Sequence, residues 1–324
     1  MLSVIKSYPF SAQANRHGIG AIYHASRSDD GNRIVSAGCD GKIKLWELPS
    51  AEDLRARVEP AGMKHKGTIT KLSTTANGRI VTLAEDMTIK VWDAKTGKCM
   101  LSIDEIFGLW GRVETFDVTS DGRWIICHQN SSYIKDKNGT AKIFDGFTGS
   151  LLMEVLGLSR HSEVLQFSPN ARMFLDGDAL WSCSHITAGN LADFTSADVA
   201  SKKVQPIRAM TLPEVTVNCS AATFSPDNKK ILYGDCDRRH IFFVWDIAAA
   251  CIADVGTSVN CHFSLARIQQ LSYCRDQSFF VVVSSTAFEV WDAAQMVCLD
   301  ISTAHGGGIN KVEFSCKSGS QLVR

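Results

Sequence analysis

The stretch GRIVTLAEDMTIKVWDAKTG, residues 78–97, has a near copy earlier in the chain, within NRIVSAGCDGKIKLWELPS at residues 32–50. Three pairs of residues hold matching positions in the two copies: Ser36 and Thr82, Asp40 and Asp86, and Trp46 and Trp92. Self-similarity at a fixed period is typical of folds in which one supersecondary unit is repeated. The two copies therefore predict a repeat protein.

An aromatic residue followed by an acidic one, after a β-branched run, marks five of these units. The pairs are Trp46-Glu47, Trp92-Asp93, Phe144-Asp145, Trp245-Asp246 and Trp291-Asp292. The aromatic residues are 46, 52, 101 and 46 positions apart, so the interval of 101 covers two units. One unit is therefore predicted to have lost its pair, within residues 181–205. A period near 46 residues suits a unit of four strands.

Turn sequences separate short alternating segments within each unit. ITKLSTT is followed by ANGR, and the turns TSDGRW (residues 119–124) and SPDNKK (residues 225–230) occupy equivalent places. Asp-Gly and Pro-Asp-Asn are strong turn signals. Almost no segment shows a sustained 3.6-residue apolar period, so the pattern predicts a nearly all-β protein.

The order of the repeated polar residues resembles that of the WD-repeat β-propeller family. The resemblance covers essentially the whole chain and implies an all-β propeller, of seven blades with the last one incomplete. It also implies that the turn Asp accepts backbone N–H groups, while the His, the hydroxyl and the Trp link three strands of one blade. Two sets of residues match this pattern: His17, Ser36, Asp40 and Trp46, and His65, Thr82, Asp86 and Trp92.

The same residues could instead be catalytic acids and bases. The same constellation recurs in two adjacent repeats, whereas an active site is normally built once, so we favour the structural role. Each hydrogen bond in a satisfied buried chain contributes about 1 kcal/mol.

The repeat starts predict a single domain over residues 1–324. Its blades are expected near 17–54, 65–104, 110–155, 161–210, 215–254 and 259–301, with a partial seventh over 305–324 and an N-terminal strand over 2–8. The seventh unit lacks one strand. This favours a chain that is a piece of a longer protein over direct pairing of residues 2–8 with 321–324. Later blades depart from the motif, at Phe144, Tyr233 and Ser285, and should depend more on packing.

Composition limits the classes of partner. Lys plus Arg equals Asp plus Glu at 34 each, so the net charge is zero and a strongly cationic nucleic-acid binder is disfavoured. The 11 cysteines are scattered singly, which predicts reduced thiols and a cytoplasmic location. The longest apolar stretch, near residues 241–255, is broken by Asp246 and Asp254, so no membrane span is predicted.

Signals of catalysis are sparse, and neither a cofactor nor a metal is predicted. The sequence has no GxGxxG after a strand, no Walker loop and no GxSxG elbow. The glycines 306–308 are not followed by a helix that would bind phosphate, and Cys236, His240, Cys261 and His262 lack zinc-ligand spacing. The chain is therefore predicted not to be an enzyme.

Two loops are the strongest candidates for partner contact, because binding residues concentrate on loops of a rigid scaffold. Both join a second strand to a third and should emerge on one face. The candidate residues are Tyr133, Lys135, Lys137, Arg238, Arg239 and His240. The alternative, two solvated hairpin tips, stays open.

The leading hypothesis for function is a non-catalytic scaffold or adaptor that presents propeller loops to a protein or peptide partner of unknown identity. A second hypothesis is a regulatory propeller fragment of a larger signalling or nucleotide-switch protein. A third is phosphate or phosphoinositide binding through the basic loops. Salt-sensitive binding would support the third hypothesis.

Overall fold

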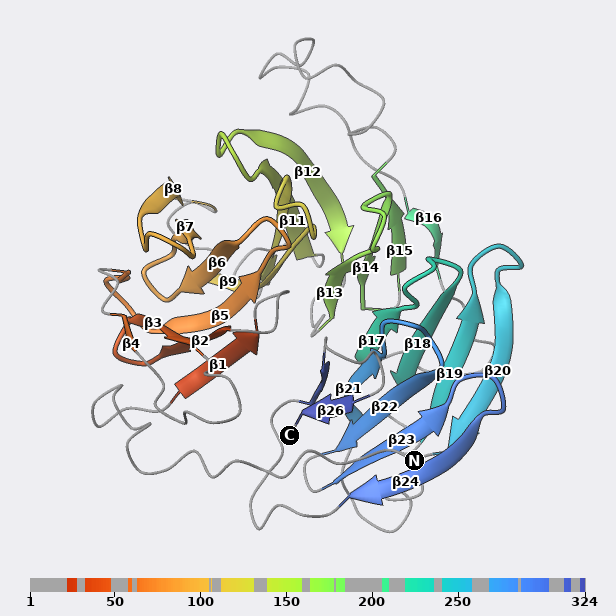
Figure 1. The fold of residues 1–324 in the computed structure, drawn as a ribbon. Coiled ribbons are helices and arrows are strands. Elements are labelled where there is room, and N and C mark those ends of the chain that lie inside the picture. The colour runs from red at the N-terminus through yellow and green to blue at the C-terminus, as the bar shows by residue number, and fades with distance from the viewer. Residues whose placement is uncertain are drawn as a thin grey trace. The chain divides into compact units, whose positions relative to one another are not determined.

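The computed structural model (Figure 1) is built from β-strands throughout its described residues. It describes residues 22–27, 33–47, 58–59, 63–104, 106, 112–130, 139–158, 164–177, 179–183, 206–209, 219–235, 241–257, 268–284, 287–302, 312–315 and 321–323. Within these ranges the strands form six four-stranded antiparallel sheets and one two-stranded sheet. The predicted all-β class of four-stranded units is confirmed.

The strands fall into two compact units, which are described separately. The first unit holds three sheets, each with its strands in chain order. Their bounds are β1 Ile22–Arg27, β2 Arg33–Gly38, β3 Ile43–Glu47 and β4 Val58–Glu59; β5 Ile69–Thr74, β6 Arg79–Ala84, β7 Ile89–Asp93 and β8 Cys99–Ile103; and β9 Arg112–Val118, β10 Trp124–Asn130, β11 Gly139–Asp145 and β12 Leu151–Leu158.

The second unit holds three further four-stranded sheets and the two-stranded one. Their bounds are β13 Leu165–Phe167, β14 Met173–Asp176, β15 Ala179–Ser182 and β16 Pro206–Ala209; β17 Cys219–Phe224, β18 Lys230–Asp235, β19 Ile241–Asp246 and β20 Cys251–Thr257; β21 Ile268–Tyr273, β22 Phe279–Ser284, β23 Phe288–Asp292 and β24 Val297–Ser302; and β25 Glu313–Ser315 with β26 Gln321–Val323.

Burial differs between the strands of a sheet, and the sequence reflects this. In β6 five consecutive residues are buried, because this middle strand has a neighbouring sheet against each face. The first strand, β5, buries only every third residue, and most of β8 is exposed or half-buried. A nearly continuous apolar run such as RIVTLA therefore indicates a middle strand, because such a strand is covered on both faces.

Apolar side chains between successive sheets make the core of each unit. Ile80 and Trp92 pack toward the β1–β4 sheet, and Val81 and Val91 pack toward the β9–β12 sheet. In the second unit, the β17–β20 sheet packs on both of its neighbours in the same way. Because successive residues point to opposite faces of a strand, one short segment serves two cores.

The turns between first and second strands repeat one hydrogen-bond pattern. A hydroxyl or thiol donates to an Asn or Asp two residues later and accepts a backbone N–H four or five residues later. The donors are Thr75, Thr119, Ser168, Ser225 and Cys274. The predicted equivalence of TSDGRW and SPDNKK is confirmed by this shared pattern.

In four of the five aromatic–acidic pairs, the acid closes the turn between the third and fourth strands. Its Oδ1 accepts backbone N–H groups from the residues two or three positions later. The four acids are Asp93, Asp145, Asp246 and Asp292. A residue with positive φ follows four positions after each acid, and two of these residues are Gly97 and Gly149.

Two predicted features differ from the structure. The first sheet extends to β4 at Glu59, beyond the predicted end at residue 54, because its fourth strand is only two residues long and carries little pattern. The fourth sheet keeps its aromatic residue: Trp181 lies opposite Phe174, as Trp92 lies opposite Ile80. Only the acid is lost there, because Ser182 occupies its place.

Candidate functional site

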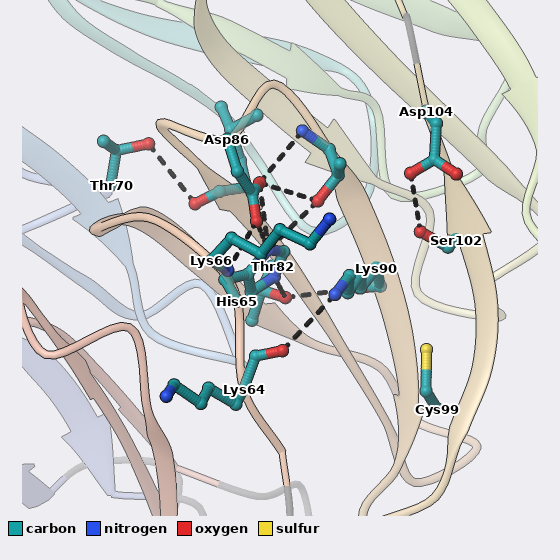
Figure 2. Close-up of polar contacts among 12 residues, drawn as sticks. Lys64, His65, Lys66, Thr70, Thr82, Asp86, Lys90, Cys99, Ser102 and Asp104 are labelled. Atoms are coloured by element: carbon teal, nitrogen blue, oxygen red, sulfur yellow. Dashed lines mark hydrogen bonds and ion pairs between the residues drawn. The ribbon is translucent and has the colours of Figure 1, made fainter.

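A continuous chain of polar side chains crosses the β5–β8 sheet (Figure 2). Trp92 Nε1 donates to Thr82 Oγ1 at 2.8 Å, and Thr82 Oγ1 lies 2.7 Å from His65 Nε2. His65 Nδ1 lies 3.2 Å from each carboxylate oxygen of Asp86. His65, Thr82 and Trp92 are buried. The structure thus brings together the four residues predicted for the second repeat.

The chemistry of these groups fixes the direction of the protons along the chain. Trp92 only donates, so Thr82 Oγ1 accepts from it; the Asp86 carboxylate only accepts, so His65 Nε2 is free to accept the Thr82 proton at 2.7 Å, in preference to the Lys90 carbonyl at 3.4 Å. His65 then carries its proton on Nδ1 and donates to Asp86. A neutral imidazole therefore satisfies every member of the chain, as a buried polar network requires.

Local backbone and side-chain donors hold the Asp86 carboxylate as an anion. It accepts the N–H groups of Lys66 at 2.8 Å and Thr88 at 3.2 Å, and the Thr88 hydroxyl at 2.7 Å. Partial burial alone would raise its pKa, but these hydrogen bonds together bring the pKa below its ordinary value. Asp86 thereby joins the β6–β7 turn to the segment that precedes β5.

Burial has the opposite consequence for His65. Desolvation lowers the pKa of its imidazole, and the attraction of Asp86 only partly offsets that effect. The residue is 1% exposed, and both ring nitrogens are occupied by neighbours inside the sheet. This arrangement supports a structural role, since a general base must reach a substrate proton.

Two further observations concern the described part of the chain. It holds no group of three His, Cys, Asp or Glu side chains placed to bind a metal ion. It also holds no helix with the length and apolar character needed to cross a bilayer.

The first repeat shows the same register with fewer described side chains. Ser36 is buried opposite Lys44, as Thr82 lies opposite Lys90. Asp40 Oδ1 accepts the Lys42 N–H at 3.0 Å, which matches the turn contact between Asp86 and Thr88. Trp46 lies on β3, but its side chain is outside the described part of the structure, as is the whole of His17.

The other sheets replace the hydroxyl of Thr82 by different chemistry. The equivalent residues are Cys127, Asp176, Tyr233 and Val282, placed by their register with the aromatic residue of each sheet. In the β21–β24 sheet, Trp291 Nε1 donates instead to Glu289 Oε2 at 2.9 Å. The polar chain is therefore not common to all repeats.

The predicted partner-contact residues lie outside the described ranges. They are Tyr133, Lys135, Lys137, Arg238, Arg239 and His240. They remain predictions.

Large exposed apolar side chains of the described residues gather on the fourth strands. Six of the seven lie there: Met100, Leu151, Val255, Val297, Leu299 and Ile301. The seventh is Phe147, in the β11–β12 turn. On β20 and β24, Asp254 and Asp300 each accept the N–H of the following residue at 2.8 and 2.9 Å. A carboxylate that occupies a backbone donor on an edge strand disfavours pairing with another strand.

Comparison with known proteins gives matches to repeat units and to several partial relatives. The family model described as "WD domain, G-beta repeat" matches residues 13–47 and 61–93. Mitochondrial division protein 1 of Eremothecium gossypii is 27% identical over 162 residues, which are 45% of this chain and 22% of that protein. Autophagy-related protein 16 of Arabidopsis thaliana is 22% identical over 237 residues, 73% of this chain and 41% of that protein.

A third relative, Protein Rae1 of Drosophila melanogaster, is 27% identical over 85 residues, 26% of this chain and 24% of that protein. The chain thus spans less than half the length of each of these three relatives.

Proposed function

Because this chain belongs to the WD-repeat proteins, which act in general as protein-interaction scaffolds, we propose that it is a non-catalytic adaptor in the cytoplasm. Its sheets would be the blades of one propeller over residues 1–324. Surface loops and turns held by these sheets would bind a protein or peptide partner.

One observation carries this proposal. The residues with the strongest acid–base character in the repeat, His65 and Asp86, are committed to hydrogen bonds that join three segments of one sheet. Their groups stabilise a scaffold, so function is left to the surface. Rigid sheets with variable loops suit binding better than chemistry.

The two predicted basic loops, with Lys135 and Lys137 in one and Arg238 and Arg239 in the other, are the first surfaces to test. Charged residues on a rim steer a partner and set specificity. Our proposal is that these loops take part in partner binding.

The experiment is affinity capture with the full chain, followed by identification and quantification of the bound proteins. We expect the double substitution Arg238→Glu with Arg239→Glu to remove specific partners from the captured set while the melting temperature is unchanged. Lys95→Glu with Lys98→Glu is the matched control, since both lysines are exposed in the β7–β8 turn region. An unchanged set of partners in the arginine variant would contradict the assignment of the loops.

A further inference from the structure

Four described turns between third and fourth strands share one backbone design but differ at one exposed position. The third residue of the turn, counted from the capping Asp, is Lys95, Phe147, Ala248 or Ala294. Only Phe147 among these four is large and apolar, and its side chain is 51% exposed. An aromatic side chain at a solvent-facing turn position is a candidate contact residue, since nothing in the turn requires it.

The backbone around Phe147 is held by several hydrogen bonds. The buried Asp145 accepts the N–H groups of Phe147 and Thr148, both at 2.8 Å. Gly146 N–H donates to the Arg123 carbonyl at 2.6 Å. A Cβ at Gly146 would clash with the Gly122 carbonyl oxygen, so glycine allows this close approach. The turn is therefore preorganised.

Arg79, from the neighbouring β5–β8 sheet, fixes the ring itself. Its guanidinium carbon lies 3.9 Å from the centre of the Phe147 ring, and its Nη1 donates to the Gly146 carbonyl at 3.1 Å. A cation over an aromatic face is attracted by the ring quadrupole. Binding a partner would thus cost little side-chain entropy, which is the advantage of a rigid aromatic anchor.

The Arg79 guanidinium lies over this ring, and a second arginine, Arg123, is joined to the same turn through its backbone. Arg79 Nη1 donates to the Gly146 carbonyl, and the backbone carbonyl of Arg123 accepts the Gly146 N–H. Arg123 is exposed, and its guanidinium carbon lies 5.7 Å from the centre of the Trp124 ring. Across the ranges that the structure describes, neither arginine forms an ion pair. Arginine forks bind carboxylates through two parallel hydrogen bonds.

We infer that Phe147, Arg79 and Arg123 form a docking surface for an acidic peptide segment, in which an apolar side chain lies next to a carboxylate. The apolar side chain packs on Phe147, and the carboxylate pairs with a guanidinium. An extended polyanion fits less well, because Asp121 is exposed in the same turn as Arg123 and would repel successive phosphates. This inference rests on the proposed binding function and names one surface and one class of partner for it.

The test is selection from a random peptide display library against the immobilised full chain. We expect peptides with Asp or Glu beside an apolar residue to be enriched. Phe147→Ala should weaken the binding of synthetic versions of the selected peptides about tenfold or more, as measured by fluorescence anisotropy. The variant should fold normally, because Ala248 and Ala294 occupy the same position in equivalent turns. Lys95→Ala is the matched control and should leave affinity unchanged.

A second variant separates charge from packing. The double substitution Arg79→Gln with Arg123→Gln should weaken the binding of acidic peptides and remove the dependence of their affinity on salt concentration. Peptides that bind equally well to wild type and Phe147→Ala would overturn this surface while leaving the proposed binding function intact. No enrichment of any peptide would count against both. Loss of polyuridylate RNA binding in the variants, without peptide enrichment, would reassign the surface to polyanions and overturn the proposal.

Discussion

The β5–β8 and β21–β24 sheets have the same outline and different interiors. Their middle strands pair in the same register, with Ile80 opposite Trp92 in one and Phe280 opposite Trp291 in the other. Their turns are capped alike, by Asp93 and by Asp292. The first sheet is crossed by the polar chain, whereas the second has Val282 at the position of its hydroxyl.

Aromatic packing fills the second interior. The rings of Phe280 and Trp291 are stacked with their centroids 6.1 Å apart. The ring of Phe242, from the adjacent sheet, lies edge-on to Trp291 with the centroids 5.0 Å apart. The comparison teaches that register and turn caps define the sheet, whereas its interior is filled either by the polar chain or by packed rings with one Trp291–Glu289 hydrogen bond. A polar chain is thus one structural solution, and the β21–β24 sheet forms without it.

The largest expected effect is on the ring-filled interior. Phe280 is fully buried, and Phe280→Ala removes its contacts and leaves a cavity, so we expect a loss of about 3–5 kcal/mol. Hydrogen–deuterium exchange of β22 and β23 peptides measures the loss locally. Val297→Ala on the exposed edge strand is the control, with a change within about 0.5 kcal/mol. Equal effects of the two substitutions would contradict packing as the source of stability.

Exchanging the hydroxyl between the two sheets should damage both. Thr82→Val leaves His65 Nε2 and Trp92 Nε1 without their partner, and we expect a loss of about 2–4 kcal/mol in the β5–β8 sheet. Val282→Thr adds a hydroxyl within a cluster of apolar side chains, opposite Glu289, whose carboxylate already accepts from Trp291 Nε1, and we expect the free energy of unfolding to fall by about 1–3 kcal/mol. Urea titrations, followed by hydrogen–deuterium exchange of the β6 and β22 peptides, measure the loss of stability in each sheet. A neutral Thr82→Val would show that the polar chain is not needed.

The two sheets should also differ in their response to pH. Burial lowers the pKa of His65 in the folded state, so below about pH 6.5 the unfolded chain binds a proton that the folded sheet does not. The contribution of neutral His65 is complete above that pH and declines toward the lower folded pKa. Between pH 7.5 and 5.5 we therefore expect the stability of the β5–β8 sheet to fall as the pH falls.

Hydrogen–deuterium exchange of the β6 and β7 peptides at the two pH values, corrected for the intrinsic exchange rates, measures this change in stability. The β22 and β23 peptides provide the reference within the same molecule, since the described residues of their sheet include no histidine. His65→Gln should remove the pH dependence in β6 and β7. A dependence that survives in this variant would place the titrating group elsewhere.

Removing the Asp that caps the turn should have the smallest effect on stability, and the effect should be the same in both sheets. Asp93 and Asp292 cap equivalent turns through backbone N–H groups, so Asp93→Ala and Asp292→Ala should each cost about 1 kcal/mol. Exchange of the β7–β8 and β23–β24 peptides measures both. A cost in only one sheet would show that the caps are not a shared device.

Much of the fold could be predicted from the sequence because the repeated positions carry rare residue types. Trp, Asp and a hydroxyl at fixed spacing define a register, and Ser36 and Thr82 occupy that register in the structure. Trp181 was missed because the following Ser182 removed the acid by which the pair was recognised. The capping role of the acid could not be read from spacing alone, since it depends on backbone N–H groups in the turn.

The candidate surface at Phe147 was harder to predict. Its sequence, DGFTGS, reads as an ordinary turn, and Arg79 lies 68 positions earlier. The two side chains meet only because successive sheets place their turns side by side. Contacts between repeats depend on geometry that no local pattern contains.

The most direct test of the central claim is a double-mutant cycle between Thr82→Val and Trp92→Phe. If the hydroxyl and the indole act as one structural unit, the two losses overlap, and the coupling energy from urea unfolding should be about 1–2 kcal/mol. Losses that add independently, with coupling near zero, would contradict the claim that these residues form a stabilising chain.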